Sequence, residues 1–171
     1  TGTENTRIFL RDAVYDDVLI RFDFQFQDSK DIRLVTGSDG HYNSVIHLRR
    51  DHFYIQTAKD NSGPYFSYRH SECSYNFDPD RWYTMTVESI DDHLVAHLDR
   101  DHVAYANHPI LNKERTYFAF QVDDEPAAFD NIQIFQVRKS PKFESNLEHL
   151  KLIINKHPFK KPLKQEYEIQ K

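Results

Sequence analysis

The sequence predicts an all-β protein, an antiparallel two-sheet sandwich, on three observations. Residues 18–27 alternate between apolar and polar side chains, the longest such run in the chain, and residues 81–137 hold further alternating runs. The 171 residues include thirteen Phe and ten Tyr but only four Gly. Alternation with period two is typical of strands with one dry and one solvated face, and aromatic residues favour strands. Because no helical crossover separates the runs, they fit a sandwich or barrel better than a parallel sheet.

Five strands are expected in the first part of the chain. They span residues 18–26, 32–35, 42–48, 52–57 and 65–69. The first should be a central, half-buried strand, because it is the longest. Turn-forming residues at 37–40 and 59–64 separate later strands, since Gly, Ser, Asp, Asn and Pro favour chain reversal.

Residues 81–137 read as four further strands. The first begins near Trp82 and turns at 91–93 into the second, and the last two carry the alternating side chains of 117–123 and 129–134. The apolar positions of these runs and of 18–26 are expected to face one shared core. The predicted core residues are Phe22, Phe24, Tyr83, Val87, Ala96, Phe118, Phe120, Ile132 and Ile134.

The composition changes after Val137, so the chain is divided into a β-sandwich domain, residues 1–137, and a C-terminal helix with a charged tail, residues 138–171. Leu147, Leu150 and Ile154 recur at helical spacing and are expected to form the stripe of a helix that packs on the sandwich.

Charge and composition narrow the classes of partner. The formal net charge of −5 is mild and interspersed, which argues against a nucleic-acid-binding surface. No apolar run is long enough to span a bilayer. The single cysteine, Cys73, excludes an intramolecular disulfide, and its surroundings resemble no catalytic cysteine signature. Composition leaves the oligomeric state open.

Three segments carry a resemblance to a known fold. Residues 15–24, 81–87 and 128–134 resemble an early aromatic strand, a tryptophan-led strand and a closing strand of the concanavalin A-like jelly roll. In particular they resemble the 3-keto-disaccharide hydrolase-type domain of secreted bacterial proteins, over about residues 8–137. The resemblance implies a β-sandwich, a carbohydrate partner, and a secreted or periplasmic location. It also implies, as an alternative, a glycoside hydrolase or hydrolase-like enzyme.

The chain departs from that pattern in two places. The tryptophan-containing strand pair that precedes the first aromatic strand in the family is missing from this sequence or was removed from it. The chain also lacks the Glu-x-Asp-x-x-Glu strand with which laminarinase-like jelly rolls supply nucleophile and acid, and the nearest run, 88–91, has the wrong spacing. The catalytic residues of an enzyme are therefore unassigned. Asp23 could meet Asp123 or Asp124 only if their strands are neighbours.

No metal site or cofactor is predicted. The histidines are scattered, and His47 and His97, the two inside strands, do not have the spacing of a zinc site. Calcium is the one ion that the sequence leaves open, because carboxylates can bind it. Its candidate ligands are Asp123, Asp124 and Asp130.

A glycan site is the favoured functional hypothesis. Sugars are recognised by aromatic rings and by planar polar groups that hydrogen-bond hydroxyls, and arginine adds a fork for an acidic group. Such side chains occupy solvated positions and are expected to converge on one concave face. They are Arg33, Asn43, His47, Arg49, Tyr54, Arg69 and Gln121. The alternatives are the enzyme and a structural or protein-interaction module that uses the sandwich as a spacer.

Overall fold

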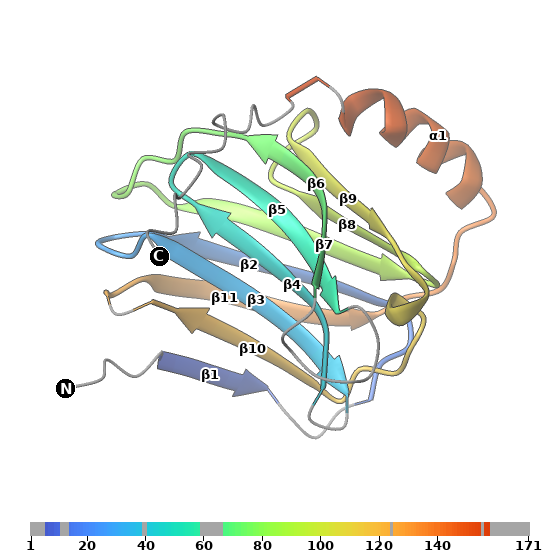
Figure 1. Ribbon diagram of the computed structural model, residues 1–171, viewed down its shortest axis with the longest axis horizontal. Coiled ribbons are helices and arrows are strands. Elements are labelled where there is room, and N and C mark those ends of the chain that lie inside the picture. Colours follow the sequence, from blue (N-terminus) through green and yellow to red (C-terminus); the bar gives the residue numbers. More distant parts are fainter. Residues whose placement is uncertain are drawn as a thin grey trace, which may run out of the picture.

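The computed structural model describes residues 6–10, 14–38, 41–58, 67–123, 125–154 and 156–157. Two antiparallel sheets face each other, and one helix lies outside them (Figure 1). This is the all-β sandwich with a C-terminal helix that the sequence predicts. Within the described residues, no helix is both long and apolar enough to span a membrane.

One sheet has six strands, in the order β1-β10-β3-β4-β5-β6. Their bounds are Thr6–Leu10 for β1, Tyr117–Val122 for β10, Asp31–Ser38 for β3, His41–Arg49 for β4, His52–Ala58 for β5 and Ser67–Ser74 for β6. The other sheet has five strands, in the order β11-β2-β7-β8-β9. Their bounds are Ala128–Gln136 for β11, Val18–Gln25 for β2, Tyr83–Ile90 for β7, His93–His97 for β8 and Val103–Asn107 for β9.

The core lies between the sheets and contains the predicted residues. Seven of the nine are buried in it, while Ile132 and Ile134 pack against its border from β11. The rings of Phe22 and Phe120, which come from opposite sheets, meet edge to face with centroids 4.9 Å apart. Edge-to-face contact is a favoured arrangement of buried aromatic pairs, so the predicted register is confirmed.

Two strands of the structure are not among those that the sequence predicts. Where four strands are expected between residues 81 and 137, the structure has five, because β9 separates β8 from β10. Strand β9 is only five residues long, and its side chains do not alternate between buried and exposed positions, so it has no period-two signal. Strand β1, the other addition, pairs with β10 at the edge of the six-stranded sheet.

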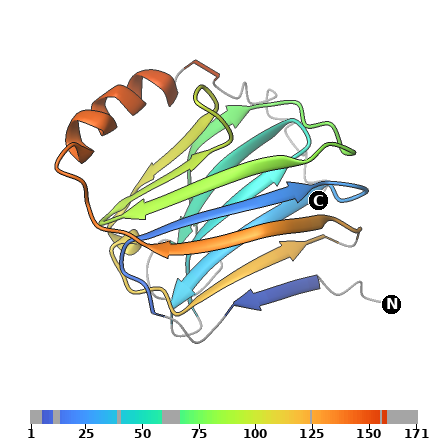
Figure 2. The same cartoon turned by 180° about the vertical axis from the view of Figure 1, so that it is seen from behind.

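The helix α1, Phe143–Ile154, lies against the outer face of the five-stranded sheet (Figure 2). Leu147 is buried, as predicted, whereas Leu150 and Ile154 are only half-buried, so the docked stripe is narrower than expected. The chain just before the helix is anchored by Lys139, whose Nζ lies 3.0 Å from Asp91 and 2.8 Å from Glu144. The predicted tail after His157 lies outside the described residues.

A buried arginine ties the two sheets together near one end. The side chain of Arg115, just before β10, is 2% exposed and donates hydrogen bonds to the Asp16 and Leu111 carbonyls and to the Ser89 hydroxyl on β7. Burial lowers the pKa of Arg115 to about 10, against the opposing effect of Asp17 and Asp16, so the guanidinium stays charged at neutral pH. Its three acceptors explain how a charged group is tolerated in the interior.

Candidate functional site

The register of the six-stranded sheet places predicted site residues in one row. Gln121 on β10 pairs with Arg33 on β3, Arg33 with His47 on β4, His47 with Tyr54 on β5, and Tyr54 with Glu72 on β6. Paired residues share a face of the sheet, and the residues on either side of Arg33 belong to the core. The row therefore lies on the outer face.

The other predicted residues lie on the same sheet. Arg49 and Arg69 pair with outward-facing neighbours, and Asn43 occupies the β-bulge where β4 shifts register against β3. All seven candidates thus come from β3, β4, β5, β6 and β10. The name polar face is used below for nine side chains of this sheet. They are Asp31, Arg33, Asn43, His47, Arg49, Tyr54, Arg69, Glu72 and Gln121.

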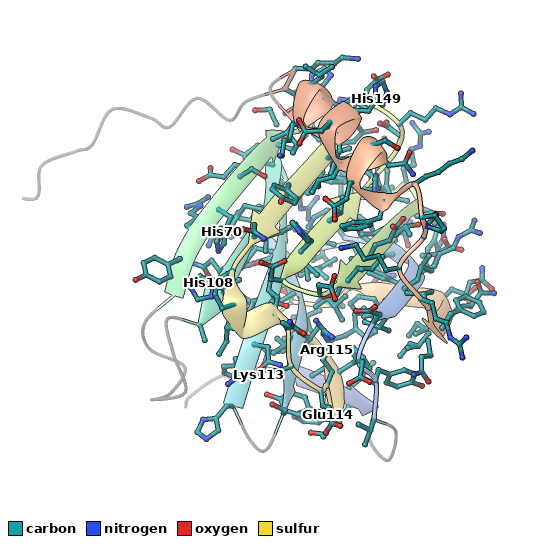
Figure 3. The ribbon with its side chains drawn as sticks, turned by 90° about the vertical axis from the view of Figure 1, so that its right-hand side faces the viewer. His70, His108, Lys113, Glu114, Arg115 and His149 are labelled. Carbon is teal, nitrogen blue, oxygen red and sulfur yellow. The ribbon has the colours of Figure 1, made fainter. Side chains whose placement is uncertain are left out.

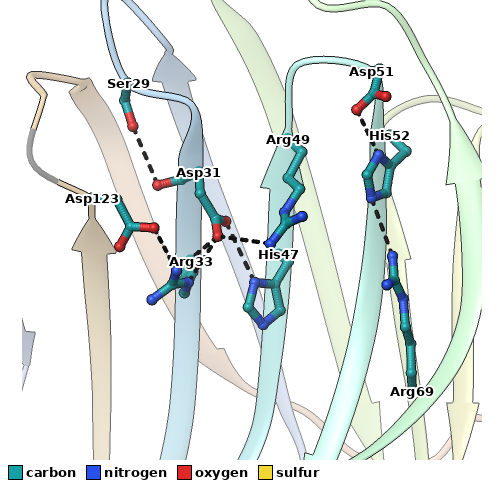
Figure 4. Close-up of polar contacts among 9 residues, drawn as sticks. All are labelled: Ser29, Asp31, Arg33, His47, Arg49, Asp51, His52, Arg69 and Asp123. Carbon is teal, nitrogen blue, oxygen red and sulfur yellow. Dashed lines mark hydrogen bonds and ion pairs between the residues drawn. The ribbon is translucent and has the colours of Figure 1, made fainter. Parts of the chain in front are cut away.

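Asp31 is the hub of the polar face (Figure 4). Its Oδ2 accepts hydrogen bonds from Arg33 Nη2 at 2.8 Å and Nε at 3.1 Å, and it lies 3.5 Å from Arg49 Nη2. Its Oδ1 lies 3.4 Å from His47 Nδ1 without a hydrogen bond between these atoms. Burial by itself would raise the pKa of Asp31, but His47 and Arg33 outweigh it and hold the pKa below its usual range.

Arg33 extends the network to β10. Its Nη2 also donates to Asp123 Oδ2 at 2.6 Å, so one guanidinium binds two carboxylates. Burial opposes the charge of Arg33, but Asp31 and Asp123 more than compensate and raise its pKa above the ordinary value. Removing Arg33 would leave the mostly buried Asp31 without its main partner, so Arg33 contributes to the stability of the fold. Its expected role as a ligand-binding group on the surface does not include this contribution.

Tyr54 is covered by its neighbours. The His47 ring stacks on it with centroids 4.5 Å apart and planes 8° apart, and the Arg69 guanidinium carbon lies 3.6 Å from its centroid. The side chain is 3% exposed, and burial raises the pKa of its hydroxyl. The expected role of Tyr54 as an open stacking platform for a sugar therefore does not fit the structure. The ring instead fixes the positions of His47 and Arg69.

Two acidic members of the polar face are absent from the candidates that the sequence provides. Asp31 begins β3 and Glu72 lies near the end of β6, and both positions fall outside the strands expected at 32–35 and 65–69. Glu72 Oε1 lies 2.5 Å from Arg69 Nε. Extending the alternation from Arg33 by one outward position would have found Asp31, whereas Glu72 faces outward only because β6 shifts register against β5, which the sequence does not show.

The polar face gathers side-chain atoms without protein partners. Among the described residues, five buried side-chain polar atoms have no hydrogen-bond partner. They are Asp31 Oδ1, Asn43 Nδ2, His47 Nδ1, Arg49 Nε and Glu72 Oε2. Buried polar groups are normally satisfied, and each exception needs an explanation. Asp31, His47, Arg49 and Glu72 lie on the outer face, and Asn43 lies at the bulge of β4 in the same sheet.

The acidic residues that the sequence considers for catalysis or calcium divide between the two sheets, and only Asp23 and Asp130 are cross-strand neighbours among those described. Asp23 lies on β2 in the five-stranded sheet, where Thr84 and Asn131 donate hydrogen bonds to it, while Asp123 follows β10 in the six-stranded sheet. Asp130 lies on β11, and Asp124 lies outside the described residues. Within the described part of the chain, no group of three or more His, Cys, Asp or Glu residues could hold a metal ion.

The histidines and the cysteine are dispersed. His47 and His97 lie on different sheets. His70 and His108 lie near each other (Figure 3), with ring centroids 6.2 Å apart, and burial, reinforced by the charge of His108, lowers the pKa of His70. Burial raises the pKa of Cys73 to about 11, so this thiol is protonated at neutral pH and unreactive.

Comparison with known proteins identifies the fold through structure alone. No known family matches the sequence, and no curated protein matches it either. The solved structures that are similar to this chain are galectin-like β-sandwiches. CG-16, a homodimeric agglutinin from chicken liver, is 9% identical with a TM-score of 0.60, over 76% of this chain and 100% of its own. The carbohydrate-binding module CBM66 from Bacillus subtilis is 15% identical with a TM-score of 0.59, over 77% and 83%. A lactose- and MES-liganded congerin II is 10% identical with a TM-score of 0.58, over 76% and 100%.

These comparisons establish the class of fold. The chain has the galectin-like, concanavalin A-like β-sandwich architecture, which is the part of the sequence resemblance that the structure bears out.

Proposed function

We propose that the protein binds a glycan on the polar face of its six-stranded sheet. The observation that carries this proposal is the clustering on the six-stranded sheet of five buried polar atoms without a hydrogen bond, of which Asp31 Oδ1 and His47 Nδ1 lie 3.4 Å apart. Leaving such atoms unsatisfied costs about 1–3 kcal/mol each, so the arrangement costs stability unless something outside the protein hydrogen-bonds to them. A hydroxyl group suits this mixture of donors and acceptors because it can do both.

The charges of the face favour an uncharged glycan over a sulfated or acidic one. The face holds the three arginines Arg33, Arg49 and Arg69 and the two carboxylates Asp31 and Glu72, and Asp123 beside it binds Arg33. Because each arginine lies within 4 Å of a carboxylate, none offers an uncompensated positive charge to an anion. Adjacent guanidinium donors and carboxylate acceptors instead form the pattern that two neighbouring sugar hydroxyls require.

The proposal agrees with what the similar structures are called. They include an agglutinin, galectins and a carbohydrate-binding module, and one congerin structure contains lactose. At 9–15% identity, their ligands give no guide to which sugar this chain would bind.

Binding is favoured over hydrolysis. A glycosidase needs a carboxylic acid whose pKa is raised so that it can protonate the leaving group. Asp31, the most buried carboxylate of the polar face, has its pKa shifted in the opposite direction and stays ionised. A hydrolase of the 3-keto-disaccharide type would require its acid elsewhere.

A glycan array followed by calorimetric titration with the best neutral ligand tests the proposal. Arg49→Ala is the informative variant, because Arg49 is the most exposed arginine of the face and its Nε has no partner. Binding should weaken by about 1.5–3 kcal/mol, the usual contribution of a hydrogen bond from a charged group. Arg81→Ala, which removes an exposed arginine from the loop before β7, is the matched control and should bind like the unaltered protein.

Either of two results would count against glycan binding at this face. One is an array in which no neutral glycan binds, which would favour the spacer function. The other is a ligand whose affinity is equal for Arg49→Ala and Arg81→Ala.

A further inference from the structure

A hollow lies on the opposite side of the sandwich from the polar face, beneath α1. It has a volume of about 370 Å³, between the helix and the outer face of the five-stranded sheet. Leu147 and Leu150 line it from the helix, Phe143 from the start of the helix, and Leu19 and Val95 from the sheet. The helix is held at both ends, because Lys139 binds Asp91 before it and Lys156 binds Asp101 after it. The hollow is therefore roofed by a tethered element.

A second, more open hollow of about 590 Å³ continues from the first along the same sheet. Leu19, Glu88 and His97 line both, so the two share a boundary. Volumes of about 300–1,000 Å³ are usual for small-molecule sites.

Strand register explains why the two hollows differ in chemistry. One row across the sheet consists of Phe135, Leu19, Glu88 and Val95. Leu19 and Val95 from this row line the hollow beneath the helix. The adjacent row is polar on four strands and ends at Val103 on β9. Its four polar members, called the polar row, are Gln133, Arg21, Thr86 and His97. The first row supplies apolar walls, and the second supplies a floor of hydrogen-bonding groups.

The polar row is open to a ligand. Among the described residues, no side chain of this row takes part in a side-chain hydrogen bond, and the nearest partner of His97 is Glu88, with 3.8 Å between Nε2 and Oε1. Burial lowers the pKa of His97 although Glu88 opposes the shift, so the imidazole is neutral at pH 7 and can donate or accept.

We propose that this groove binds a small amphiphile, with an apolar chain beneath α1 and a hydroxylated head on the polar row. The exposed ring of Phe135 borders the head region and can cover the apolar side of such a head. The site lies on the other sheet from the polar face. Its test is therefore independent of the test of the proposed glycan site.

Octyl β-D-glucopyranoside, used below its critical micelle concentration, is the probe. Methyl β-D-glucopyranoside presents the head alone and 1-octanol presents the chain alone. Thermal shift and titration should show saturable binding of the octyl glucoside that is at least about tenfold tighter than binding of either fragment, because only the whole molecule contacts both hollows.

Variants locate the site. Val95→Phe fills the hollow from the sheet and Leu150→Trp fills it from the helix, and each should weaken the octyl glucoside at least about tenfold. Val45→Phe makes the same change on the outer face of the other sheet and should leave binding unchanged. Thr86→Val removes one hydroxyl of the polar row and should weaken the octyl glucoside while leaving octanol unaffected. Circular dichroism verifies the fold of each variant. If Val95→Phe does not fold, the test rests on Leu150→Trp alone.

Three results would overturn the proposal. They are equal affinity for octanol and the octyl glucoside, equal affinity for the methyl and octyl glucosides, and unchanged binding in a folded variant whose hollow is filled.

Discussion

The guanidinium carbon of Arg69 lies 3.6 Å from the centre of the Tyr54 ring, which places a cation from β6 directly on an aromatic ring from β5. The same guanidinium binds Glu72, so its position is fixed by a ring and a carboxylate together. A side chain held in this way loses little conformational entropy when it meets a ligand.

Arg69→Ala should lower the free energy of unfolding by about 1–3 kcal/mol, because it removes a cation–π contact and leaves the half-shielded Glu72 without its partner. Arg49→Ala is the control, since its guanidinium carbon lies 5.7 Å from the same ring centre and its side chain is more exposed. Urea denaturation measures both. Equal losses would mean that the contact of Arg69 with Tyr54 contributes nothing.

Phe120→Ala should lower the free energy of unfolding by about 3–5 kcal/mol, because it empties the centre of the core where Phe22 and Phe129 meet it. Phe135→Ala removes a ring that is 49% exposed and should cost far less. Chemical denaturation of the two variants provides the comparison. A small loss for Phe120→Ala would be incompatible with the packing of the two sheets described above.

Two leucines of α1 test whether the helix is docked. Leu147→Ala should cost about 2–5 kcal/mol, the range for buried leucines, whereas Leu152→Ala, at a position that is 72% exposed, should stay within about 0.5 kcal/mol of the unaltered protein. Thermal denaturation, read by β-sheet circular dichroism, measures both. Deleting the chain after Val137 should likewise lower stability and keep the β-sheet spectrum, and a truncated chain of full stability would refute docking.

The lowered pKa of Asp31 makes stability depend on pH in the acid range. The folded protein holds this carboxyl ionised below the ordinary value of 3.8, so the stabilisation is present above that pH and is lost as the pH falls through the folded pKa. Asp31→Asn should flatten the stability curve below about pH 4. Denaturation midpoints from pH 2 to 7 give the measurement, with Asp51→Asn, an exposed carboxylate, as control. Parallel curves for the two variants would contradict the role given to Asp31.

The sandwich itself was determined by local sequence. The alternation through Val18, Phe22 and Phe24 can bury its apolar members only on one face of a strand, and that constraint is independent of which strand lies next to it. Strand β9 was not predicted because its five residues, Val103–Asn107, do not alternate between apolar and polar side chains.

The polar face was determined only in part by sequence. Alternation put Arg33, His47 and Tyr54 on solvated positions, but it could not say that they share a row, because register depends on pairing between strands distant in the chain. The tertiary structure made Asp31 their hub and buried Tyr54 between His47 and Arg69. Strand pairing and side-chain burial depend on which residues are neighbours in space, so they cannot be read directly from a single sequence.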